Sequence, residues 1–182
     1  KELHFPDEPK VLFGRYSDRN KSKEQYDSWD KSLSLFKEKK YIESYKQFFN
    51  YLKDNDLGNV IYVSEESKIS FTIIQGSKIV KGMINNHEIT AEAELVRFDL
   101  LEVPVMRKLL QENYYLYSSK FAIKNDIYTL KYFSPVEDAH PSGLYYALQE
   151  LATEADMYDD VLVEEFDSLH AINLEHIEQI PD

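Results

Sequence analysis

Strict alternation between residues 89 and 95 constrains the fold of this chain more than any other feature. The apolar positions are Ile89, Ala91, Ala93 and Leu95, and the residues between them are Thr90, Glu92 and Glu94. Successive side chains of a β-strand point to opposite faces, so this pattern puts the apolar residues on one face and the acidic residues on the other. Alanine and glutamate favour helices, but a helix cannot maintain a period of two. The sequence therefore predicts a half-buried strand here.

Weaker patterns of the same kind surround this strand and predict an antiparallel meander over residues 59–97. Its other strands are expected at 60–63, 69–73 and 79–84, separated by polar turns. Asn85-Asn86 is expected to form a tight hairpin turn because asparagine tolerates positive φ. A second hairpin is predicted over residues 118–133, with Asn125-Asp126 as its turn.

Helical periodicity covers three other parts of the chain. Residues 27–54 are expected to form a helical hairpin, residues 102–113 a short helix and residues 142–165 a long acidic helix. The long helix has one apolar stripe, formed by Leu144, Leu148, Leu151, Ala155, Tyr158 and Leu162. The hairpin resembles one tetratricopeptide unit, but no second copy follows. A helix pair that covers a sheet is therefore the favoured interpretation.

The predicted element order defines the fold class. Two helices, four strands, a helix, two strands and a final helix form an α+β protein, in which helices pack on one antiparallel sheet. This order argues against a doubly wound nucleotide-binding fold, in which strands and helices alternate. We expect an extension over residues 1–26, a single domain over 27–167 and a C-terminal tail over 168–182.

Charge is distributed unevenly along the 182 residues. No lysine or arginine follows Lys131, and 13 of the 33 acidic residues lie after it; the other 20 nearly balance the 21 basic residues. The formal net charge of −12 therefore belongs to the last 51 residues. It predicts a basic partner, or the positive face of a second copy, near this segment; a solvated helix face is the simpler interpretation. The acidic balance argues against nucleic-acid binding.

No catalytic, cofactor or metal site is predicted. The chain has no cysteine, which excludes disulfides, thiol catalysis and thiolate metal sites. His170 and His176 lack the spacing of a zinc-binding helix, and the five glycines cannot form a phosphate-binding loop. His140 lies beside Asp138 in a loop bounded by prolines, where an acid–base pair is conceivable but a polar loop is favoured. No apolar run is long enough to span a membrane, and a cytoplasmic location is expected.

Three segments together resemble a known family. They are VPVMRKLLQENYYL, SSKFAIKNDIYTLKYFSPV and GLYYALQELATEADMYDDVLVEEF, between residues 103 and 166. This order resembles the type III secretion chaperone-like fold, including the YbjN-like family of sensory-transduction regulators. The resemblance extends over residues 27–167 when the meander is included. It implies a homodimer that binds unfolded or extended segments of partner proteins, and it implies no catalytic residue.

These observations predict a non-enzymatic protein-binding module that holds a segment of a partner protein. Tyrosine is enriched at protein interfaces, and the candidate interface residues are Met106, Leu110, Tyr114, Tyr115, Tyr117, Tyr145, Tyr146, Asp160 and Glu164. Two alternatives stay open. One is a small-molecule-binding or hydrolytic enzyme with a pocket between helices and sheet that includes His140. The other is an acidic mimic of nucleic acid that binds a basic protein.

Overall fold

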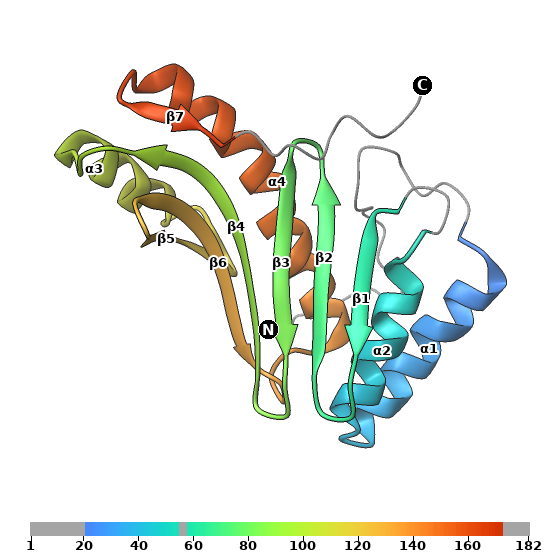
Figure 1. The fold of residues 1–182 in the computed structure, drawn as a ribbon. Helices are drawn as coiled ribbons and strands as arrows, with labels where there is room; N and C mark the ends of the chain where they lie inside the picture. The colour runs from blue at the N-terminus through green and yellow to red at the C-terminus, as the bar shows by residue number, and fades with distance from the viewer. Residues whose placement is uncertain (1–20, 55–57, 173–182) are drawn as a thin grey trace.

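The computed structural model describes residues 21–54 and 58–172, which form one sheet with helices packed on it (Figure 1). The helices are α1 Lys23–Lys37, α2 Tyr41–Leu52, α3 Val103–Glu112 and α4 Pro141–Glu165. The strands are β1 Val60–Ser64, β2 Ile69–Gln75, β3 Lys78–Ile84, β4 Glu88–Phe98, β5 Ser119–Lys124, β6 Ile127–Pro135 and β7 Leu169–Ala171. The α+β class and the predicted order of elements are confirmed.

All strand pairs in the sheet are antiparallel. The order across the sheet is β1-β2-β3-β4-β6-β5, so β4 and β6 are the partners that join the meander to the second hairpin. The structure adds one strand, β7, which pairs with residues 96–98 of β4. Residues 169–171, which form β7, were expected to belong to a C-terminal tail. A three-residue strand has too short a pattern to be recognised in the sequence, and it forms because β4 extends beyond the end of β3.

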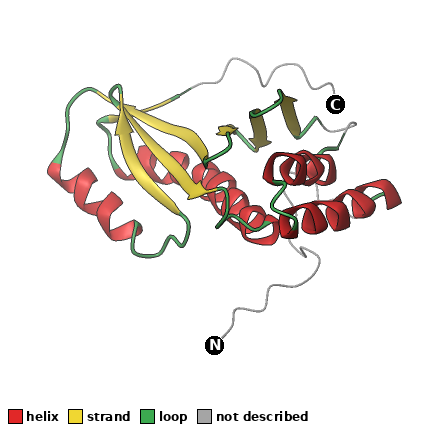
Figure 2. Cartoon of the chain, turned by 90° about the horizontal axis from the view of Figure 1, so that it is seen from below, coloured by secondary structure: helices red, strands yellow, loops and turns green. Residues whose placement is uncertain are grey.

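The core lies between the sheet and α4. One row of side chains crosses five strands and is fully buried: Val60, Ile73, Val80, Ala93 and Leu130. The predicted apolar stripe of α4 faces this side of the sheet, and Leu148, Leu151 and Leu162 are each 0% exposed. Figure 2 shows α4 and the α1–α2 pair on the same side of the sheet, so the opposite face of its central strands is uncovered.

The α1–α2 hairpin covers the β1 end of the sheet. Helix α1 begins four residues earlier than predicted because Ser22 and Gln25 form a reciprocal capping box. Lys39 adopts a left-handed φ of 61° and reverses the chain before α2. The ring of Phe49 on α2 lies 4.7 Å from that of Phe71 on β2. The prediction of a helix pair that covers a sheet is therefore confirmed.

The two asparagine turns behave differently. Asn125 and Asp126 have φ values of 50° and 60°, as a tight hairpin turn requires. Asn85 and Asn86 do not have positive φ, so the expected reason for their use is wrong. Instead, the side-chain oxygen of Asn85 accepts hydrogen bonds from the backbone N–H groups of His87 and Glu88. Asparagine serves this turn as a side-chain acceptor.

The turn between β2 and β3 is attached to the middle of α4. Gly76 has a φ of +53°, and a Cβ atom there would lie 2.1 Å from the carboxylate of Asp156. The same carboxylate accepts a hydrogen bond of 2.9 Å from the backbone N–H of Ser77. Beside it, the buried Lys78 ammonium lies 2.7 Å from Asp159. Two acidic residues of the C-terminal segment thus have structural roles inside the fold.

Candidate protein-interaction surfaces

Helix α3 is apolar on two sides, of which only one is covered. Val105 and Leu109 are buried against the domain. On the other side Val103 and Leu110 are 52% and 71% exposed, with the half-buried Met106 between them at helical spacing. A helix that needed only to pack on its own domain would have polar residues on this side.

Three exposed tyrosines continue this apolar stripe. Tyr114, Tyr115 and Tyr117 are 86%, 63% and 94% exposed. The rings of Tyr114 and Tyr115 pack edge to face with centroids 5.6 Å apart. We call this surface the α3 patch, and define it as Val103, Met106, Leu110, Tyr114, Tyr115 and Tyr117. Contiguous exposed apolar side chains of this kind mark interaction sites on soluble proteins.

The loop that carries these tyrosines is held by Glu150 of α4. Its carboxylate accepts hydrogen bonds from three consecutive backbone N–H groups, those of Tyr117, Ser118 and Ser119, at 2.8, 2.9 and 2.7 Å. At the start of the loop the side-chain oxygen of Asn113 accepts a hydrogen bond from the N–H of Phe121. The α3 patch is therefore positioned before any partner arrives, which reduces the entropy lost on binding.

We expect Glu150→Gln to loosen this loop. The amide N–H₂ that replaces one carboxylate oxygen cannot accept, so at least one of the three hydrogen bonds would be lost, and the others would no longer be made to a charged group. Because a hydrogen bond to a charged group is worth about 1.5–3 kcal/mol, hydrogen exchange at residues 117–119 should accelerate by about tenfold or more. Glu164→Gln on the exposed side of the same helix is the matched control. Equal exchange rates in the two variants would show that Glu150 does not hold the loop.

Acidic groups gather where α3 meets α4. The Tyr158 hydroxyl donates a 2.6 Å hydrogen bond to Glu112, which also pairs with Lys108 at 3.0 Å. The hydrogen bond from Tyr158, assisted by Lys108, lowers the pKa of Glu112. Burial raises the pKa of Glu154, and the negative charges of Glu150 and Glu112 raise it further. Three carboxylates, those of Glu112, Glu150 and Glu154, therefore lie near one another beside this loop, with the ammonium groups of Lys108 and Lys120 also close by.

The remaining predicted interface residues lie elsewhere on α4. Tyr145 is only 2% exposed and belongs to the core, so its inclusion in an interface was wrong. Tyr146 is partly buried against the core. Asp160 and Glu164 are both exposed, one turn apart, close to Met157, which is 47% exposed. Met106, Leu110, Tyr114, Tyr115 and Tyr117 lie on α3 and the loop that follows it, and the other four lie on α4.

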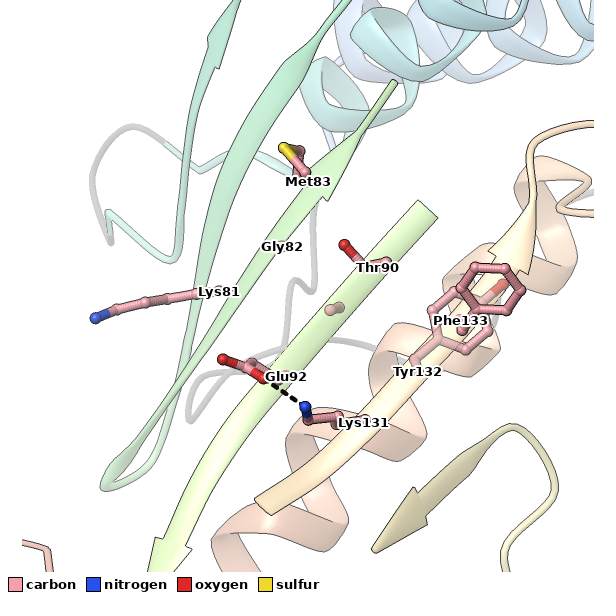
Figure 3. A pocket seen from close by; sticks show the side chains of 9 residues that line it. Lys81, Gly82, Met83, Thr90, Glu92, Lys131, Tyr132 and Phe133 are labelled. Carbon is pink, nitrogen blue, oxygen red and sulfur yellow. Dashed lines mark ion pairs between the residues drawn. The ribbon is translucent and has the colours of Figure 1, made fainter. Parts of the chain in front are cut away.

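A second surface, on the uncovered face of the sheet, was missed by the sequence analysis. It contains a hollow of about 480 Å³ over β3, β4 and β6 (Figure 3). One row of side chains across these strands is charged, with Lys81 opposite Glu92 and Glu92 opposite Lys131. The next row has Met83 opposite Thr90 and Thr90 opposite Phe133. We call these six residues the open-face site. Its pairing register could not be read from the sequence.

The histidines of the described residues do not form a catalytic group. His140 caps α4 by accepting a hydrogen bond of 3.3 Å from the N–H of Ser142, and its ring lies 5.2 Å from that of Phe36. Burial, and then the charge of Lys37, lowers the pKa of His140. His170 contacts Asp99 at 3.1 Å on the surface, and His176 lies outside the described residues. No group of three or more metal-binding side chains occurs in residues 21–54 and 58–172.

Hydropathy adds one finding about the helices. Within the part of the chain that the structure describes, no helix is both long enough and apolar enough to cross a bilayer.

Comparison with known proteins gives few similarities. No protein-family model matches the chain, and no curated protein matches it significantly. Among solved structures, the chain is similar to one in the crystal structure of the ExsC–ExsE complex, with 14% sequence identity and a TM-score of 0.37. That alignment covers 57% of this chain and 75% of the other. Fold and surfaces together define an α+β protein with an exposed, pre-positioned apolar patch.

Proposed function

We propose that the chain is a non-enzymatic protein-binding module that holds a segment of a partner protein on the α3 patch. The observation that carries this proposal is the exposure of Leu110, Tyr114 and Tyr117, which are 71%, 86% and 94% accessible on a loop and helix held in place by hydrogen bonds. Tyrosine combines a large apolar area with few rotatable bonds, and it often contributes a large share of interface energy.

Charge indicates the chemistry of the partner. The α3 patch borders Glu112, Glu150 and Glu154; burial raises the pKa of Glu154, and repulsion from Glu150 and Glu112 raises it further. A basic side chain that approached this rim would relieve the repulsion, and its approach would be accelerated by the negative charge of these carboxylates. The partner segment is therefore one in which apolar or aromatic residues are flanked by lysine or arginine.

The test starts from a library of random twelve-residue peptides selected on the whole protein. Recovered peptides should combine apolar residues with lysine or arginine. Binding of the synthesised peptides should weaken by about 30-fold or more in Leu110→Ala/Tyr114→Ala, because truncation of an interface hot spot costs about 2 kcal/mol or more. Tyr26→Ala, which changes a 40% exposed tyrosine on α1, is the matched control and should have little effect.

Two results would count against the proposal. Selected peptides that bind the double variant as tightly as the original chain would place the interaction elsewhere. The second result concerns the predicted homodimer. If sedimentation shows a dimer that Leu110→Ala/Tyr114→Ala converts to a monomer, the occupant of the α3 patch is a second copy and not a partner segment.

No observation favours the two alternative functions over this one. A pocket that gathers His140 with carboxylates would have favoured the enzyme hypothesis, whereas His140 packs against Phe36 and caps a helix. The nucleic-acid mimic would use its acidic residues to bind a basic protein. Several of the acids on α4 instead serve the fold: Asp156 and Asp159 hold a turn, and Glu150 holds a loop.

A further inference from the structure

The open-face site carries more positive than negative charge. Glu92 is shared by Lys124 and by Lys131, whose ammonium lies 3.3 Å from it. Burial alone would raise the pKa of Glu92, but the hydrogen bonds and charges of the two lysines lower it. Lys81, directly opposite Glu92 on β3, is exposed and forms no ion pair with any described residue. The open-face site thus has two ammonium groups and one carboxylate, and Glu94, on the same face of β4, acts on Lys124. Lys81 is the ammonium group of the site that no described carboxylate neutralises, and it attracts anions.

An apolar row runs beside the charged row. Phe133 is 62% exposed, and Met83 is partly exposed two strands away. The pairing register continues this row through Ser70 to Val63 at the edge of the sheet, where Val63 is 63% exposed. The two rows are separated by two residues along each strand, a distance of about 6.7 Å. Side chains of opposite character are thus presented in parallel lines across an uncovered sheet.

We infer that the open-face site is a second binding surface, and that it binds an extended protein segment in which acidic and apolar residues alternate. Successive side chains of an extended segment point in opposite directions. A segment that lies across the strands would place its acidic side chains on Lys81 and Lys131, and its apolar side chains on Met83 and Phe133. This surface differs in charge from the α3 patch and is built from different elements, so the two bind different segments.

The experiment uses a capped nine-residue peptide of alternating glutamate and leucine and the full chain. Titration followed by NMR should shift the signals of the Met83 methyl group and of the Phe133 ring. Binding should weaken as salt rises, because exposed charges are screened. One control peptide has lysine in place of glutamate, and a second has the same residues with all the glutamates at one end. Both should bind more weakly than the alternating peptide.

Variants then separate this surface from the α3 patch. Lys81→Gln/Lys131→Gln should weaken peptide binding by about 2- to 25-fold, because each exposed charge pair contributes about 1.5- to 5-fold. Phe133→Ala should weaken it as well. Lys23→Gln/Lys31→Gln, an equal charge change at two exposed positions on α1, and Leu110→Ala/Tyr114→Ala should leave binding unchanged.

Three outcomes of the peptide experiments would overturn the inference. They are equal binding of the lysine peptide, unchanged affinity in the Lys81→Gln/Lys131→Gln variant, and signal shifts confined to the α3 patch. A dimer of the free protein that dissociates in the Phe133→Ala variant would assign this face to a second copy and would also overturn it. Equal binding of the lysine peptide and unchanged affinity in the Lys81→Gln/Lys131→Gln variant do not bear on peptides selected for the α3 patch, so the two proposals can fail separately.

Discussion

Replacement of Lys78 by methionine is expected to lower the free energy of unfolding by about 3–5 kcal/mol. The ammonium is 2% exposed, pairs with Asp159 at 2.7 Å and donates a hydrogen bond to the carbonyl of Leu95 at 3.1 Å. Without it, the Asp159 carboxylate would stay buried with the Ser77 hydroxyl as its remaining donor at 3.1 Å. The large cost comes from this uncompensated charge and not from the worth of the ion pair itself.

A double variant distinguishes these two causes. Lys78→Met/Asp159→Leu removes both charges and should recover most of the lost stability, because apolar replacement of a whole buried pair is often neutral. Urea unfolding followed by the fluorescence of Trp29, the one tryptophan of the chain and 1% exposed, measures both variants. A cost below about 1 kcal/mol for Lys78→Met, or no recovery in the double variant, would contradict this explanation.

The second large effect is expected at Phe49, where α2 meets the sheet. Its ring is 0% exposed and contacts three other rings, at 4.7 Å for Phe71, 5.3 Å for Phe48 and 5.5 Å for Tyr62. Phe49→Ala should therefore cost about 3–5 kcal/mol, from lost burial and from the cavity that remains. Separation of the α1–α2 hairpin from the sheet should accompany the loss.

Phe133→Ala is the matched control because it makes the same chemical change at a ring that is 62% exposed. It should cost less than about 1 kcal/mol, mostly through the preference of strands for aromatic residues. Urea unfolding of the two variants side by side tests the contrast. Similar costs for Phe49→Ala and Phe133→Ala would mean that the aromatic cluster does not anchor the helices.

Much of the candidate surface was predictable because local periodicity encodes it. Leu110, Tyr114, Tyr115 and Tyr117 lie where the helical pattern of α3 ends, and the structure leaves them exposed. Tyr145 was misassigned although a signal existed, since Tyr145, Leu148, Ala152 and Ala155 follow one another at helical spacing and all are buried. The roles of the acidic residues on α4 were also predicted only in part. The sequence alone indicates that a carboxylate such as Glu150 is solvated, because it does not show which backbone N–H groups donate hydrogen bonds to it.

Most elements of this protein follow from its sequence alone: a period of two indicated the meander and the second hairpin, a period of 3.6 indicated the helices, and their order indicated an α+β sheet, whereas the three-residue β7 had too short a pattern. How those elements meet depends on the tertiary fold. The register that aligns Lys81 with Glu92 and Lys131, the attachment of the β2–β3 turn to α4, and the choice of which sheet face the helices cover all depend on contacts between distant residues. Alternation shows that a strand has two different faces, but it holds no information about which neighbour lies beside it, because pairing and packing are set by the whole chain at once.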